Sequence, residues 1–206
     1  MSIKPILFNT EMVRAILDWR KDATRRIVKG FIPDDAVWGY TAFTPKGYIS
    51  CRGTFADGYG EKFFKLPCEP GDILYVRETW KKAPNGYYYY EDWQRNDIAD
   101  VTKWKPSIHM PKEAARIWLK VTDVRVERLQ EITDEQAKRE GIQYDECPTG
   151  FTWKQETDMH NCYTTPIGAM QALWNSTIRK SDIDRYGWDA NPWVWVIEFE
   201  RCEKPA

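Results

Sequence analysis

The stretch RIWLKVTDVRVERLQEITDEQAKREGI, residues 116–142, contains two elements from which the fold can be argued. Its first half alternates apolar and charged residues. The apolar positions are Ile117, Leu119, Val121, Val124 and Val126. A period of two is typical of an antiparallel strand with one face on a core and the other in solvent. The alternation slips near Asp123, which predicts an irregularity such as a β-bulge.

The second half of the stretch predicts a short helix. Thr133 and Gln136 form a capping box and Gly141 suits the C-terminal cap, so we expect about two helical turns. Glu140 is the last residue of this helix. A carboxylate there opposes the helix macrodipole, by typically ~0.3–1 kcal/mol, so its position indicates a role other than helix stability.

Strand signals dominate the rest of the chain. Residues 69–80, EPGDILYVRETW, predict a turn and then a strand, and residues 191–202, NPWVWVIEFERC, predict a buried strand. The aromatic, glycine-rich residues 31–67 predict antiparallel hairpins. A short strand at residues 6–8 precedes a helix that is capped by Asn9 or Thr10 and ends near Arg20.

One further helix is expected to start at Thr165-Pro166 and to cover the core. Its apolar face consists of Ile167, Met170, Leu173 and Trp174. The whole pattern predicts one α+β domain over residues 1–206, an antiparallel β-barrel or strongly curved sheet with short helices packed around it. Loop or hairpin insertions are expected near residues 31–66, 81–112 and 143–164.

The composition limits the partners. Lys+Arg 30 against Asp+Glu 31 nearly cancel, so any contact with nucleic acid must be local. The five cysteines lack CxxC spacing and favour reduced thiols. Cys147, His160 and Cys162 lie outside the usual zinc spacings, so we expect neither a metal nor another cofactor. No stretch approaches the ~18 apolar residues of a membrane helix, and we expect a cytoplasmic protein without a membrane partner.

A cationic segment follows the first helix. Residues 18–30, DWRKDATRRIVKG, gather five cations around Thr24. The cations are Arg20, Lys21, Arg25, Arg26 and Lys29. Such a cluster complements the helix dipole and is usually a solvated surface, but it could also activate the Thr24 hydroxyl. The residues alone leave both interpretations open.

Several stretches, in their order along the chain, resemble the ASCH family of small β-barrels related to the PUA fold, and within it the phage and prophage branch. The stretches are KPILFNTEMVRAILD, GDILYVRETW, WKPSIHMP, RIWLKVTDVRVERLQEIT with AKREGI, and NPWVWVIEFER. The resemblance implies a PUA-like barrel and, for a phage or prophage protein, the cytoplasm of a bacterial host cell.

Two hallmarks of the family carry the resemblance. The pattern G-x-K-x-x-T-x-R after the first helix is matched by Lys21, Thr24 and Arg26. Trp19 replaces its Gly, and Asp22 stands where a Thr is usual. The Glu-Gly pair after the long strand is present as Glu140-Gly141.

The resemblance implies recognition of a modified nucleobase, a nucleoside or RNA. In small bacterial members the equivalents of Lys21, Thr24 and Glu140 form the catalytic set of an amidohydrolase that removes the acetyl group from N4-acetylcytidine. Other relatives bind RNA or cleave it with a divalent metal. Whether this chain is an enzyme is therefore open, and amide hydrolysis is the reaction to test.

The residue types suit that chemistry. Thr24 can be a nucleophile once a base takes its proton, and Lys21 could be that base if burial and the neighbouring arginines keep it neutral. Glu140 could position Lys21 or protonate the departing nitrogen. Arg26 is better suited to an oxyanion or phosphate.

Further substrate contacts are expected from several segments. Arg20 and Arg25 flank the presumed catalytic pair. Glu78 and Trp80, near a strand end, suit hydrogen bonding and stacking to a base. Ser107 and His109 could line the pocket.

Two alternatives to the enzyme stay open. The first is a non-catalytic module that binds RNA or DNA. The second, a metal-dependent ribonuclease, has less support because the sequence offers no clear carboxylate cluster. The sequence does not determine the natural substrate, the oligomeric state or the role of residues 81–112.

Overall fold

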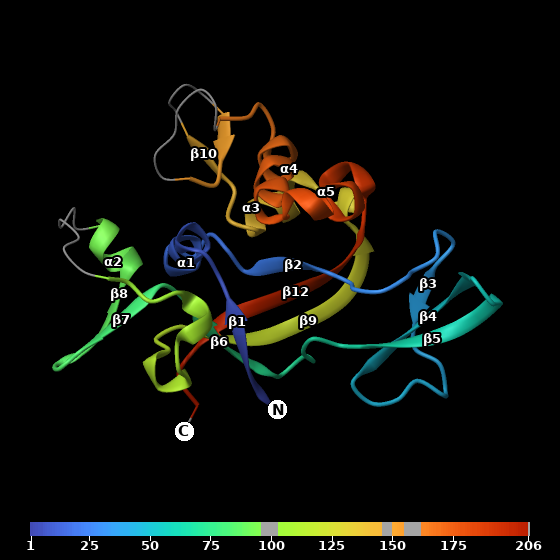
Figure 1. Ribbon diagram of the computed structural model, residues 1–206, viewed down its shortest axis with the longest axis horizontal. Coiled ribbons are helices and arrows are strands. Elements are labelled where there is room, and N and C mark those ends of the chain that lie inside the picture. The colour runs from blue at the N-terminus through green and yellow to red at the C-terminus, as the bar shows by residue number, and fades with distance from the viewer. Residues whose placement is uncertain (96–102, 146–149, 155–161, 206) are drawn as a thin grey trace.

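A five-stranded sheet forms the centre of the computed structural model, which describes residues 1–95, 103–145, 150–154 and 162–205 (Figure 1). In spatial order its strands are β1 (Ile3–Leu7), β6 (Ile73–Arg77), β9 (Trp118–Arg128), β12 (Trp193–Cys202) and β2 (Ala23–Ile27). Neighbours pair antiparallel except β1, which runs parallel to β6. The expectation of a purely antiparallel sheet is therefore wrong for β1 and β6. A long stretch of chain joins these two strands, and such a connection allows them to run in the same direction, whereas a hairpin does not.

The longest pairing joins β9 to β12. Its register runs from Trp193 opposite Arg128 to Cys202 opposite Trp118. Glu198 lies opposite Asp123 but Phe199 lies opposite Val121, so β9 contains one extra residue, Thr122. This bulge confirms the slip predicted near Asp123, and it adds local twist to the sheet.

The two outer strands of this sheet, β1 and β2, approach each other without pairing. Among the described residues the sheet therefore does not close into a barrel. The Arg26 side chain bridges the seam, since its Nη2 donates to the Leu7 carbonyl at 2.8 Å. A side chain thus occupies the position that a further ladder of backbone hydrogen bonds would take in a closed barrel.

Three smaller sheets lie in the expected insertions. They are β3 (Val37–Gly39), β4 (Tyr48–Phe55) and β5 (Gly58–Lys65), then β7 (Trp80–Ala83) and β8 (Gly86–Tyr89), and finally β10 (Gln143–Asp145) and β11 (Gly150–Thr152). The antiparallel hairpins predicted for residues 31–67 are confirmed. Figure 1 shows β3–β5 at one end of the molecule and β7–β8 at the other.

Short helices cover the central sheet. The α-helices are α1 (Thr10–Leu17), α2 (Tyr90–Arg95), α3 (Asp134–Arg139), α4 (Pro166–Thr177) and α5 (Ile183–Tyr186). The 3-10 helices are η1 (Ser107–His109), η2 (Lys112–Ala114), η3 (Leu129–Glu131), η4 (Lys180–Asp182) and η5 (Trp188–Ala190). Side chains of Asn9, Thr133 and Thr165 cap α1, α3 and α4, and α3 has the predicted capping box. Figure 1 shows α3, α4 and α5 gathered on one side of the sheet.

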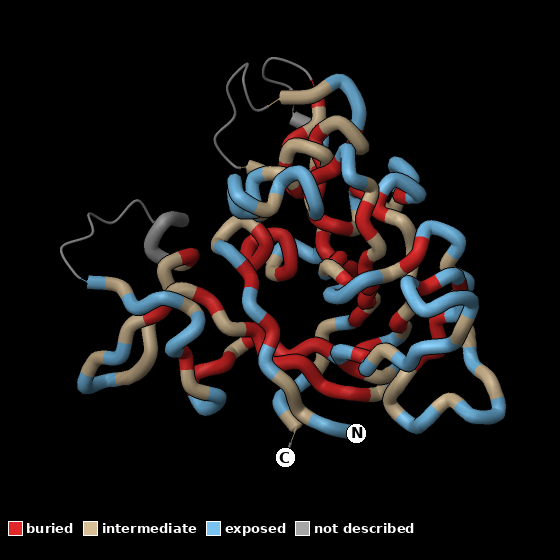
Figure 2. The backbone as a smooth tube through the Cα atoms, turned by 45° about the vertical axis from the view of Figure 1, so that its right-hand side comes forward, coloured by how far each residue is buried: buried red, intermediate tan, exposed pale blue. Residues whose placement is uncertain are grey.

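The main core lies between this sheet and the helices. Ile16 of α1, Leu119 and Val121 of β9, and Val194 of β12 are almost completely buried. Figure 2 shows the buried residues following the central strands, with exposed residues concentrated in the outer loops. The chain is thus a mixed α+β protein, mostly strands in several sheets with a few short helices. Within the described residues, no helix has the length and apolar character needed to span a membrane.

Candidate functional site

A pocket of about 200 Å³ opens between β2, the N-terminal part of α1, and α4. We call it the Thr24 pocket. Its charged and hydroxyl-bearing lining residues are Lys21, Thr24, Arg25, Arg26, Glu140 and Thr177. Its apolar lining residues are Leu7, Phe8, Met12, Met170, Leu173 and Trp174, and Asn9 completes the set. A mostly apolar lining with a few convergent polar groups is typical of a small-ligand site.

Lys21 and Glu140 form a buried ion pair at this pocket. Lys21 Nζ donates to Glu140 Oε2 at 2.7 Å, to the Glu140 carbonyl at 2.9 Å and to the Ala23 carbonyl at 2.7 Å. Only 1% of the Lys21 side chain and 4% of the Glu140 side chain are exposed. Three acceptors match the three N–H groups of an ammonium, so this geometry is that of a charged lysine.

The Glu140-Gly141 pair explains how residues so far apart in the chain meet. Glu140 ends α3, and Gly141 continues with φ +102°, which favours glycine. A Cβ at Gly141 would lie 2.9 Å from Ala15 Cβ. Glycine therefore allows the end of α3 to pack closely against α1, and this contact brings Glu140 to Lys21 in a backbone bridge.

Arg25 binds the other oxygen of the same carboxylate. Its Nη1 donates to Glu140 Oε1 at 3.1 Å, and its Nη2 donates to Gln136 Oε1 at 3.2 Å and to Glu127 Oε2 at 3.4 Å. Glu140 therefore neutralises two buried cations at once, which accounts for an acid at the unfavourable end of α3.

The surroundings of Lys21 act against its positive charge. Burial lowers the pKa of Lys21, the Glu140 carboxylate opposes this shift, and the positive charges of Arg26 and Arg25 add to it. The effect of burial and arginines has the direction predicted from the sequence.

Thr24 and Arg26 come from the edge strand β2. Thr24 is buried opposite Ile197 of β12 and lines the same pocket as Lys21 and Glu140. Arg26, two residues further on, has its guanidinium 5.2 Å from the Phe8 ring centroid. Arg26 and Leu7 also line a second, more apolar pocket of about 300 Å³ beside β1. The Arg26–Leu7 hydrogen bond thus lies where the two pockets adjoin.

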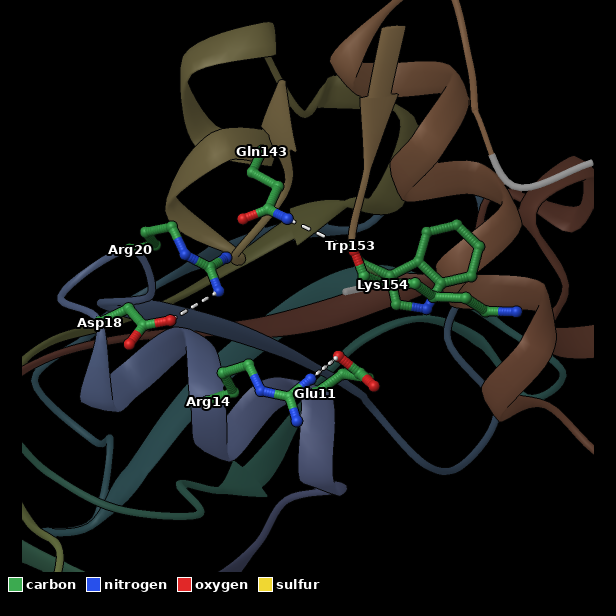
Figure 3. Close-up of a pocket in the computed structure, with 7 residues that line it drawn as sticks. All are labelled: Glu11, Arg14, Asp18, Arg20, Gln143, Trp153 and Lys154. Atoms are coloured by element: carbon green, nitrogen blue, oxygen red, sulfur yellow. Dashed lines mark hydrogen bonds and ion pairs between the residues drawn. The ribbon is translucent and has the colours of Figure 1, made fainter. Parts of the chain in front are cut away.

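Arg20 lies outside the Thr24 pocket. It faces a charged pocket together with Glu11, Arg14, Asp18, Gln143, Trp153 and Lys154 (Figure 3). Arg20 Nη1 donates to the Gly141 carbonyl at 3.0 Å and its Nη2 donates to Asp18 Oδ2 at 3.3 Å. Arg20 therefore holds the Gly141 turn through the Gly141 carbonyl.

Glu78 belongs to a separate buried ion network. Arg116 donates to both of its carboxylate oxygens at 2.9 Å and to Asp92 Oδ1 at 2.7 Å. Burial raises the pKa of Glu78, and its hydrogen bond with Arg116 opposes the shift. Trp80 is also buried, with Lys105 Nζ 5.1 Å from its ring centroid. The structure gives both residues a packing role and does not bring them to Thr24.

The remaining predicted contacts also lie elsewhere. Ser107 and His109 are in η1 and do not line the Thr24 pocket, and His109 is exposed. Cys147 and His160 lie outside the described residues. Among the residues that are described, no group of three or more His, Cys, Asp and Glu side chains is placed to hold a metal ion.

Sequence reasoning missed the apolar part of the site. Met170, Leu173 and Trp174 of α4 were expected to cover the core, and they also line the Thr24 pocket. Phe8 and Met12 are likewise buried hydrophobic residues that also line this pocket. Their spacing predicts which face of a helix is apolar, but it does not distinguish a residue in the core from one beside a cavity.

No protein-family model, curated protein or solved structure matches this chain.

Proposed function

We propose that the chain adopts the PUA-like fold of the ASCH family and recognises a modified nucleobase in the Thr24 pocket, where it hydrolyses an N-acyl amide such as that of N4-acetylcytidine. The observation that carries the proposal is the buried Lys21–Glu140 contact of 2.7 Å in a pocket that also contains Thr24. Arg26 lies at the same pocket, so the residues that match both hallmarks are near one another.

The reaction follows from these groups. Lys21 passes a proton to Glu140 and then, as a neutral amine, takes the proton of Thr24 Oγ1 as that oxygen attacks the acyl carbonyl carbon. The C–N bond breaks as Glu140 protonates the departing nitrogen. Lys21 then passes its proton to Glu140 again and takes a proton from the water that attacks the Thr24 ester. As the ester C–O bond breaks and the carboxylic acid leaves, Lys21 returns that proton to Thr24 Oγ1 and regains its own from Glu140. Arg26 supplies a fixed positive charge for the carbonyl oxygen or for a phosphate.

The lining suits a flat heterocycle. Phe8 and Trp174 offer aromatic surface, and Met12 and Met170 offer adaptable apolar surface. The Lys21–Glu140 pair provides both acid and base within one contact. This combination favours a base with a reactive exocyclic amide over a fully apolar ligand.

Replacement of Lys21 tests the proposal. We expect the wild-type protein to convert N4-acetylcytidine to cytidine and acetate, and Lys21→Met to lose at least ~100-fold in kcat/KM because it lacks the base. Chromatography of the nucleosides measures this. Lys138→Met is the matched control, since Lys138 is exposed and pairs only at the surface with Glu135. If the wild-type protein hydrolyses none of the N4-acylcytidines tested, the proposed amide hydrolysis is wrong.

A second candidate is a non-catalytic RNA-binding module. The saturated hydrogen bonding of Lys21, with three acceptors, favours it because the resting amine is not poised as a base. For such a module, Arg26→Glu should weaken binding of a single-stranded RNA at least ~10-fold and reduce its salt dependence. Arg52→Glu, on the exposed face of β4, is the control. Unchanged RNA affinity in Arg26→Glu would exclude Arg26 as a phosphate contact.

A further inference from the structure

Trp19 has a backbone conformation that a bulky residue rarely adopts. Its φ is +61°, in the left-handed region. Trp19 N–H donates to the Ile16 carbonyl at 3.2 Å and Arg20 N–H donates to the Ala15 carbonyl at 2.8 Å. These two bonds are the Schellman motif that ends α1, and the left-handed position of this motif is usually glycine. Tryptophan thus occupies a position where glycine would adopt the same left-handed conformation at a lower conformational free energy.

Burial does not compensate for this conformation. Trp19 is 75% exposed. The Arg201 guanidinium lies over the indole, 4.4 Å from its centroid, and Arg201 Nη1 also donates to the Leu17 carbonyl at 3.3 Å. The ring is therefore held from one side by a cation that is itself tied to α1, while most of its surface meets solvent.

We propose that Trp19 is a stacking platform for an unpaired base of an RNA strand whose modified base occupies the Thr24 pocket. This inference rests on the proposed function and specifies RNA, rather than a free nucleoside, as the substrate. The Trp19 indole is exposed, and the Arg201 guanidinium holds it in place from one side. Such a ring can stack on a nucleobase, and stacking accepts any base because every base has a π-face.

The surroundings of Trp19 favour a base over a protein partner. Both of its chain neighbours, Asp18 and Arg20, are charged, so neither adjacent residue extends the ring into an apolar patch. Protein interfaces need a contiguous buried centre, whereas a single aromatic ring suffices for one base. Arg20 and Arg201 add positive charge next to the ring for the phosphate backbone.

The position of Trp19 suits a neighbouring nucleotide. One residue, Arg20, separates it from Lys21, so the Cα atoms of Trp19 and Lys21 lie at most ~7 Å apart. Stacked bases rise by about 3.4 Å per step along a strand. A base one or two steps from the modified one can therefore reach Trp19 when the modified base enters the Thr24 pocket.

The test compares Trp19→Gly with the wild type on two ligands. For a single-stranded RNA that contains one N4-acetylcytidine, we expect the affinity to fall about 10- to 100-fold, the range of one lost base stack. For free N4-acetylcytidine we expect kcat/KM within about twofold of the wild type, because Trp19 does not line the Thr24 pocket. The melting temperature should rise by a few degrees, since glycine suits φ +61°.

Two further variants complete the experiment. Trp19→Phe should keep most of the RNA affinity, and Tyr59→Ala, at an equally exposed aromatic residue on β5, should keep all of it. Unchanged RNA affinity in Trp19→Gly, with nucleoside hydrolysis intact, overturns the stacking role and leaves the proposed function standing. Equal losses on both ligands also overturn it, because Trp19 would then shape the pocket. A wild type that acts on neither ligand refutes the proposed function itself.

Discussion

Thr24→Val is expected to reduce hydrolysis of N4-acetylcytidine by at least ~10³-fold while the protein stays folded. Valine has the shape of threonine and the same branching at Cβ, so it fits strand β2 opposite Ile197. The substitution removes only the hydroxyl that we propose as the nucleophile. Chromatographic detection of cytidine measures the rate, and the denaturant midpoint checks that the fold is retained.

Two variants control this prediction. Thr122→Val changes the exposed bulge residue of β9 and should leave the rate unchanged. Thr24→Ser keeps a hydroxyl and should retain part of the activity. Wild-type turnover in Thr24→Val would show that water, not Thr24, attacks the amide, and the covalent mechanism would have to be abandoned.

Glu140→Gln is expected to destabilise the protein by about 3–5 kcal/mol and to stop hydrolysis. The side chains of Lys21 and Arg25 are each 1% exposed, and Glu140 binds both. The amide keeps the size of the carboxylate but removes its charge, so buried Lys21 loses its ion-pair partner and Arg25 keeps Glu127 alone of its two carboxylates. Urea unfolding measures the loss, and the melting temperature should fall by on the order of 10 °C.

Glu135→Gln provides the matched control. Glu135 lies in the same helix α3, but its side chain is 81% exposed and forms only a surface pair with Lys138. Such a pair contributes at most about 0.5 kcal/mol. If Glu140→Gln unfolds within about 1 kcal/mol of the wild type, the buried Lys21–Glu140 ion pair makes no large contribution to stability, and this prediction is wrong.

Local patterns predicted much of the fold correctly. The alternation in residues 117–126 predicts β9 and its bulge, because both depend on neighbours in the chain. The capping box at Thr133 likewise predicts α3. The unfavourable position of Glu140 correctly indicated a role beyond the helix, and that role is the neutralisation of Lys21 and Arg25.

Long-range pairing could not be predicted in the same way. Nothing local to β1 indicates that it runs parallel to β6 instead of joining a hairpin. Glu78 was interpreted as a ligand contact because it is a charge near a strand end, but its partner Arg116 is 38 residues away. A sequence reveals that a charge needs a partner without revealing whether that partner is an arginine or a ligand.

Strand β12 lies between β9 and β2, although it is the last of these strands along the chain. During translation β2 leaves the ribosome early and must wait for β12, on the order of ten seconds at ~5–20 residues per second. Until then Thr24 lies in a strand without its partner, even after Glu140 has been made. A nascent chain would therefore gain a competent site only after β12 has been made, and chaperones would meet β2 as an unpaired segment.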